Sequence, residues 1–187
     1  LHLEAGLQTT SGEALRAIRR RGRPDQTWDG LTFLCSQDNL DVHVDLLAGL
    51  PRLTYAATMT DLEQITSLGP DEIQLEVLKI LPGTPLQAQA ASLGIVHAPD
   101  PPFEVLTTDV VGPAELERLR LISRLVDGIY NEAALRDCTL LAARAIPGFY
   151  DRFLDFLQAA GKHEQVLSLQ NRFKLFHAFA KAENLAL

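Results

Sequence analysis

Three short stretches of the chain place acids, amides and imidazoles at every second position. They are LHLEAGLQ at 1–8, VHVDLLAGLP at 42–51 and DEIQLEVLKIL at 71–81. Successive side chains of a β-strand point to opposite faces, so each stretch predicts a strand with one apolar and one polar face. In the second stretch the strand is expected at 42–48, before the turn at 49–51. Carboxylates, amides and an imidazole on one surface can bind a polar ligand or transfer protons. The residues that would gather there are Glu4, Gln8, His43, Asp45, Gln74 and Glu76.

This alternation leaves two interpretations open. In one, the strands lie at the edge of a sheet and their polar face is in water. In the other, the polar face lines a binding site. The turns favour the site, because ligands of α/β folds bind at the carboxyl ends of the strands. Gln8, Asp45 and the loops that begin at Gly49 and Pro82 are expected at those ends.

Single residues of this face carry less information than the pattern. His2 and His43 have the parity of the polar face, but a lone strand histidine is more often a hydrogen-bonded wall residue than a catalyst. Glu76 could handle protons, although a wall role fits it better. Cys35 and Cys138 are the two cysteines, and no Cys/His ligand spacing surrounds them, so the sequence predicts no zinc or iron–sulfur site. We expect both to be reduced fillers of the core, as in a cytoplasmic protein.

The segments between these strands have helical signals. Thr10 and Glu13 have the spacing of a capping box, which predicts a helix that starts at Thr10. Strand and helix then alternate, which is typical of parallel βαβ units. The APDPP stretch at 98–102 indicates a linker, FEVLTT can add a short extended piece, and the chain is helical in pattern after Pro113. The further helices are expected at 28–36, 54–69, 82–94, 116–129, 149–161 and 166–179.

The polar strand faces decide between α/β architectures. An open doubly wound sheet is covered on both faces and needs apolar residues on both. A closed parallel barrel fills its lumen with branched apolar side chains, whereas an incomplete one leaves room for a ligand. We therefore expect an α/β fold with a partial parallel (β/α) barrel at 1–97 and an all-helical domain at 98–187.

The composition excludes several partners. The net charge is −7, which argues against a general nucleic-acid surface. The basic run RAIRRRGR at 16–23 is interpreted as the solvated end of a helix. No apolar run approaches the ~20 residues that cross a membrane, so no membrane contact is expected.

The motifs of the first half resemble a known family. LHLEAGLQTTSGEALRAIRR, HVDLLAGLP and LPGTPL look like the second half of a radical SAM enzyme barrel. They are most similar to the anaerobic coproporphyrinogen oxidase group and to the cobalamin-binding radical SAM proteins. In the latter a helical domain follows the barrel, and PPFEVLTT resembles its start. The resemblance implies that Gln8, Arg20 and Asp45 contact S-adenosylmethionine, with Glu4 in the same cofactor site.

The resemblance also implies what the chain lacks. The CxxxCxxC motif that holds the family's 4Fe–4S cluster is absent from this sequence. We therefore interpret the chain as a fragment of a radical SAM oxidoreductase, inactive alone, with cobalamin binding left open. A magnesium-protoporphyrin monomethyl ester cyclase is one named relative, and the full-length protein would act on a small molecule.

Two further expectations concern interactions. The alternative function is a non-catalytic module, in which the half-barrel is a vestigial scaffold and the helices dock a partner. Either way, half a barrel leaves the strand at 1–8 with an open edge. The fragment is therefore expected to self-associate, or to cover the opening with its Phe-rich helices at 149–157 and 173–179.

Overall fold

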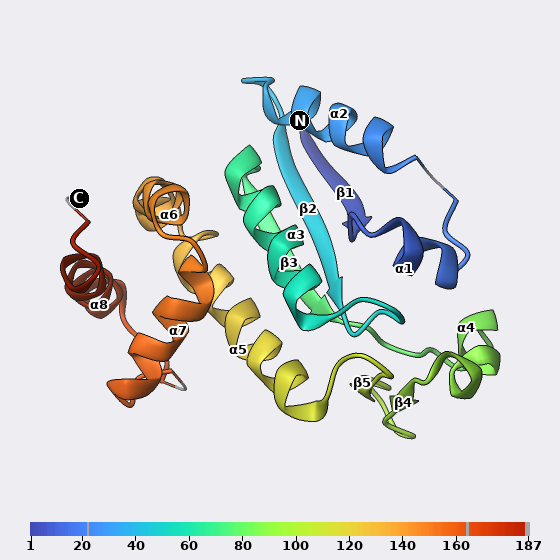
Figure 1. Ribbon diagram of the computed structural model, residues 1–187. Coiled ribbons are helices and arrows are strands. Elements are labelled where there is room, and N and C mark those ends of the chain that lie inside the picture. The colour runs from blue at the N-terminus through green and yellow to red at the C-terminus, as the bar shows by residue number, and fades with distance from the viewer. Residues whose placement is uncertain (22, 164, 186–187) are drawn as a thin grey trace.

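A three-stranded parallel sheet forms the first part of the molecule. The computed structural model describes residues 1–21, 23–163 and 165–185. Strands β1 (His2–Gln8), β2 (Asp41–Ala48) and β3 (Glu72–Val77) pair in the order β1-β2-β3, and both pairings are parallel (Figure 1). The prediction of parallel strands in βαβ order is therefore confirmed for these three strands.

The alternation of the sequence fixes which face of the sheet is buried. Val42, Val44 and Leu46 of β2 are at most 1% exposed, while the residues between them are partly exposed. Burying each such side chain contributes about 1.5–3 kcal/mol to stability. If β2 shifted by one residue against its neighbours, its apolar side chains would all point into water. The alternation therefore also determines the register of the strands. All the polar residues of the three strands therefore share the opposite face.

The first helices follow β1. Helix α1 (Gly12–Ala17) begins after Ser11, whose hydroxyl accepts a hydrogen bond from the Ala14 amide. The predicted cap at Thr10 is wrong, because the Thr10 hydroxyl donates to the buried carboxylate of Asp61 instead. Helix α2 (Pro24–Cys35) then leads back to β2. It begins four residues before the expected segment at 28–36.

Helix α3 connects β2 to β3 and covers the apolar face of the sheet. It spans Tyr55–Leu68, starts at the Thr54 hydroxyl and ends at Gly69, whose φ of 75° is the left-handed conformation that glycine adopts at least cost. The side chains of Leu62 and Ile65 are fully buried between α3 and the sheet. The expected range of 54–69 is thus confirmed almost to the residue.

The chain after β3 forms short elements. Strand β3 is shorter than the expected 71–81, because the chain beyond Val77 pairs instead with the segment around Glu104. FEVLTT does contribute a strand, and its pairing is antiparallel. These elements are α4 (Pro85–Gln89), the 3₁₀ helix η1 (Ala91–Leu93), β4 (Val96–His97) and β5 (Val105–Thr107).

The last part of the described chain is helical. Its elements are α5 (Pro113–Ile129), α6 (Ala133–Ala145), α7 (Phe149–Ala159) and α8 (Leu169–Ala182). Rings of α7 and α8 interlock, with the Phe153 and Phe179 centroids 4.8 Å apart. Helix α8 begins after Ser168, whose hydroxyl caps it, so Val166 lies outside the helix and is exposed.

The helices of the last part, α5 to α8, lie on the side of the molecule away from β1, whereas α1 and α2 lie beside β1 (Figure 1). Helices α3 and α5 separate the sheet from α6, α7 and α8, and β1 lies on the far side of α3 from these last three helices (Figure 1). The Phe-rich helices therefore do not cover the β1 edge, and that expectation is wrong. The buried rings of these helices, those of Phe149, Phe153, Phe176 and Phe179, pack instead against one another between α7 and α8, whereas Phe173 is 41% exposed.

The fold class is thus a mixed α/β protein with a three-stranded parallel sheet and many helices. The residues that the structure describes form an open sheet and no closed barrel. Within the same residues, no helix is both long and apolar enough to cross a membrane.

Candidate functional site

The carboxyl end of β1 gathers three of the residues expected to bind a cofactor. They surround Gly6: an added Cβ there would lie 3.1 Å from Gln8 Nε2, 3.8 Å from Arg20 Nη2 and 3.8 Å from Asp45 Oδ2. The Arg20 guanidinium also donates a hydrogen bond to the Gly6 carbonyl. An amide from β1, a carboxylate from β2 and a cation from the loop after α1 therefore meet around one residue without a side chain. We call these four residues the Gly6 group.

The backbone of β1 is irregular at this point. The register against β2 shifts between Ala5 and Gln8, and Gln8 has a φ of 71°. A non-glycine residue in this region costs of order 1–3 kcal/mol and is often found at functional sites. At this irregularity the Gln8 amide lies beside Gly6.

A second cluster lies one step toward the amino ends of the strands. Glu4 pairs with His43 in the β1–β2 register, and His43 pairs with Glu72 in the β2–β3 register. His43 Nε2 lies 3.2 Å from Asp45 Oδ1, and their side chains are 11% and 24% exposed. One ligand atom from each of Glu4, His43 and Asp45 fits within 4.8 Å of the others. We call these three residues the His43 group, and Asp45 belongs to both groups.

Several carboxylates lie close together on this polar face of the sheet and affect one another's pKa values. Burial raises the pKa of Asp45, the nearby His43 opposes this effect, and the carboxylates of Glu4, Glu72 and Glu76 raise the pKa further. Glu76 behaves differently, because a hydrogen bond from Lys79 at 3.0 Å lowers its pKa. Gln74 donates a further bond to Glu76 at 3.1 Å. Glu76 is therefore held ionised in a local network, which favours the wall role over proton transfer.

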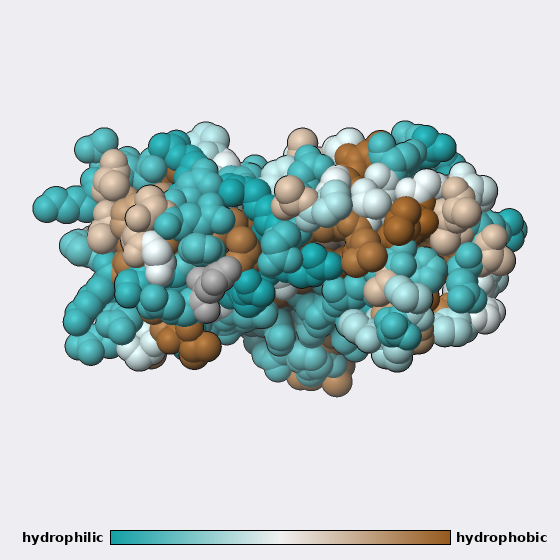
Figure 2. All heavy atoms as spheres, turned by 90° about the horizontal axis from the view of Figure 1, so that it is seen from below, coloured by the Kyte–Doolittle hydropathy of each residue, from teal (hydrophilic) through white to brown (hydrophobic). Residues whose placement is uncertain are grey.

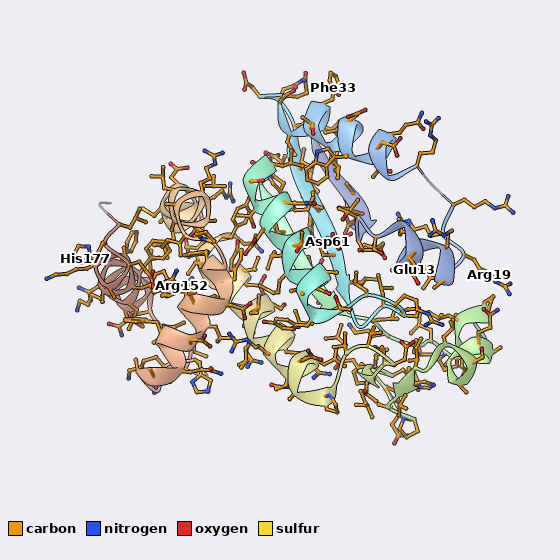
Figure 3. The ribbon with its side chains drawn as sticks, in the orientation of Figure 1. Glu13, Arg19, Phe33, Asp61, Arg152 and His177 are labelled. Carbon is orange, nitrogen blue, oxygen red and sulfur yellow. The ribbon has the colours of Figure 1, made fainter. Side chains whose placement is uncertain are left out.

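An open cleft adjoins the Gly6 group. It has a volume of about 610 Å³ and lies between the end of β1, α1 and α2. Its lining includes Thr9, Thr10, Arg20 and Trp28. Figure 3 shows Asp61 reaching from α3 toward the same region, where it accepts hydrogen bonds from both threonines. Apart from Arg20, which the family resemblance suggested, these residues carried no sequence signal for a site, because they come together only through the packing of α1, α2 and α3 around the end of β1.

The structure also places the other residues that the sequence analysis considered. The basic run at 16–23 is exposed over its described residues apart from the half-buried Ala17 and Ile18, and Arg20 of this run donates a hydrogen bond to β1. Cys35 and Cys138 are free and half-buried, on α2 and α6. His2 is exposed, with its ring 6.1 Å from that of His43. The sequence did not single out the pairing of Glu4 with His43, since it depends on strand register.

The chain is a mixed α/β protein whose parallel sheet carries a polar face at the carboxyl ends of its strands, followed by helices. Residues 91–186 match the family model described as protein of unknown function (DUF4080), which covers slightly more than half of the chain. The chain therefore belongs to this family. No curated protein matches it.

Proposed function

We propose that the chain is part of a radical SAM oxidoreductase and that the Gly6 group contributes to its S-adenosylmethionine site. The convergence of Gln8, Arg20 and Asp45 around Gly6 carries this proposal. The matched family is associated with radical SAM and cobalamin-binding proteins, which supports it further. On this proposal, β1, β2 and β3 are strands of a parallel (β/α) barrel that continues from the open edge of β1.

The chemistry of the Gly6 group fits the ligand. S-adenosylmethionine carries ribose hydroxyls, an ammonium and a carboxylate. The Asp45 carboxylate can accept from hydroxyls or the ammonium, the Arg20 guanidinium can bind the carboxylate, and the Gln8 amide can do either. Because Gly6 has no side chain, a ligand can approach the backbone of β1 closely. In the proposed enzyme, bound S-adenosylmethionine supplies the radical chemistry, and these residues bind and orient it.

The described residues do not fit an iron–sulfur cluster. Such a cluster needs several neighbouring thiolates. The two cysteines lie on different helices, and the one metal-type ligand group within the described ranges contains neither of them. We therefore assign no step to a cluster in this chain. In the proposed full-length protein, other parts would hold the cluster, and any cobalamin.

The test is ligand binding in the full-length protein. Gln8→Ala and Asp45→Ala should each weaken S-adenosylmethionine binding by about 1.5–3 kcal/mol, the usual cost of losing a hydrogen bond that involves charge. Gly6→Ala should weaken it too, because the new Cβ would displace the Gln8 amide from its place at 3.1 Å. Calorimetry measures all three.

The matched control is Gln74→Ala, an amide on the same face that bonds Glu76 outside the Gly6 group. Unchanged binding in both Gln8→Ala and Asp45→Ala would contradict the proposal.

The alternative is a non-catalytic interaction module, and one observation favours it. Leu81, Val96 and Leu106 are 53%, 55% and 44% exposed, around α4, β4 and β5. Figure 2 shows apolar side chains gathered on the part of the lower face where Figure 1 places these elements. This alternative predicts that Leu106→Lys removes binding to a protein partner while S-adenosylmethionine binding is absent from the start. A pull-down together with calorimetry on the full-length protein separates the two functions.

A further inference from the structure

Two buried polar atoms of the His43 group have no hydrogen-bond partner. His43 Nε2 and Asp45 Oδ1 are both inaccessible to solvent and unbonded, although they lie only 3.2 Å apart. Buried polar atoms are nearly always satisfied in native proteins, and an exception calls for a cause such as an ion. The two atoms are close, but their directions do not form a hydrogen bond.

Their separation suits joint coordination of a metal ion. Two ligand atoms each ~2.1 Å from one ion lie roughly 3.0–3.4 Å apart at ordinary coordination angles. The 3.2 Å between His43 Nε2 and Asp45 Oδ1 falls in this range. A carboxylate oxygen of Glu4 lies within 4.8 Å of both. Glu4 is exposed on β1, so its side chain can turn the remaining distance toward the ion.

The surrounding charge also favours a cation. Glu4, Asp45 and Glu72 all lie close to the single imidazole of His43, which leaves an excess of negative charge there. Lys79 does not relieve it, because this lysine is held by Glu76 at 3.0 Å. Glu72 Oε2 lies 3.9 Å from His43 Nδ1, where a small movement would let it accept the ring proton and orient Nε2 toward the ion.

We propose that Glu4, His43 and Asp45 form a binding site for a divalent transition-metal ion. One imidazole and two carboxylates suit Zn²⁺, Co²⁺, Mn²⁺ or Fe²⁺ better than Ca²⁺ or Mg²⁺. Three protein ligands leave coordination positions open, as in catalytic rather than structural sites. Asp45 directs Oδ1 to this site and Oδ2 to the Gly6 group, so a metal-bound water or ligand would sit beside the cleft of β1. This inference does not rest on the proposed function.

The experiment uses the 187-residue chain, stripped with a chelator and titrated with CoCl₂. The expected result is one Co²⁺ per chain with visible absorption bands, and displacement of the Co²⁺ by ZnCl₂. Glu4→Gln and His43→Gln should each lower the Co²⁺ affinity about tenfold or more, since even partners that only orient a ligand change affinity by 10–100-fold. Circular dichroism checks that both variants fold.

The controls replace residues of the same types elsewhere. Figure 3 places Glu13 on α1 and His177 on α8, the latter at the opposite end of the molecule from β1. Glu13→Gln and His177→Gln should leave the Co²⁺ affinity unchanged. If His43→Gln does not fold, Glu4→Gln decides alone, because Glu4 is exposed and its loss should not unfold the sheet. Absence of saturable binding, binding that survives Glu4→Gln, or an equal loss in His177→Gln would each overturn the proposal.

Discussion

Asp61 is the residue whose environment most clearly predicts a stability effect. Its side chain lies on α3, is 3% exposed, and accepts hydrogen bonds from the Thr9 hydroxyl at 2.5 Å and the Thr10 amide at 3.2 Å. Asp61→Ala should lower the free energy of unfolding by about 2–3 kcal/mol, because it leaves buried donors unpaired. Urea denaturation measures this loss.

The matched control for Asp61 is Asp137→Ala on α6, where the carboxylate is exposed. It should change stability by no more than about 0.5 kcal/mol. Equal effects of the two substitutions would show that the network at the end of β1 does not stabilise the fold.

Asp45 predicts a pH dependence of stability. Burial raises its pKa in the folded chain above the ordinary value of about 3.9. The folded state then binds the proton more tightly than the unfolded state, so stability falls as pH rises from that value through the folded pKa. Asp45→Asn should make this fall smaller, with Asp127, whose pKa burial also raises, contributing the rest, and should be the more stable chain at neutral pH. Urea denaturation across pH 4–8, in a chelator to exclude metals, measures the difference.

The control is Asp41→Asn, at the exposed start of the same strand. It retains Asp45 and should therefore retain the fall in stability with pH. A flat profile for the unsubstituted chain would contradict the assignment of buried charge to Asp45.

At the scale of elements, the outer edge of β3 is closed by a side chain. The Asn131 amide accepts a hydrogen bond from Ile73 N at 3.0 Å and donates one to Ile73 O at 2.9 Å, as a neighbouring strand would. Asn131→Ala leaves both backbone groups unpaired and should cost about 1–3 kcal/mol. It should also speed hydrogen exchange at the Ile73 amide, which mass spectrometry or NMR detects.

Asn171→Ala is the control for that substitution, since this asparagine is exposed on α8. It should leave both quantities unchanged. Unaltered exchange at Ile73 in Asn131→Ala would mean that the edge is protected by burial rather than by the amide.

The sequence predicted whether a segment is a helix or a strand wherever its apolar residues recur at a regular spacing. The alternation in β2 and the apolar spacing in α3 located both elements to within one residue, because each buries one whole face. Helix α6 was not separated from its neighbours, since its buried positions include Thr139 and Ala142 rather than a run of large apolar residues. The end of β3 was missed because its next partner, around Glu104, is distant in the sequence.

The candidate site was predictable only in part. The alternation of side chains along the strands placed Glu4, His43 and Asp45 on one face of the sheet. Their grouping depends on register, and the bulge at Gln8, where its amide lies beside Gly6, has no local signal. The motifs of the family resemblance suggested Arg20, whose contact with Gly6 requires α1 to fold back over β1.

At the scale of the whole molecule, β1 is paired on one side only within the described residues. Its free edge presents backbone donors and acceptors to any second strand. The Phe-rich helices lie on the far side of α3 and leave this edge open (Figure 1). We therefore predict that the 187-residue chain self-associates through β1, with a molar mass by light scattering that rises with protein concentration.

A proline at His2 tests whether the β1 edge is the interface. Leu1 O accepts from Asp41 N, and backbone groups alternate in direction along a strand, so the groups of His2 point to the open edge. His2→Pro removes an edge donor and leaves the bonds to β2 intact, which proline tolerates only in edge strands. The variant should be monomeric at concentrations where the parent chain associates, with the same circular dichroism. Association that persists in His2→Pro would place the interface elsewhere, such as the exposed apolar residues around α4, β4 and β5.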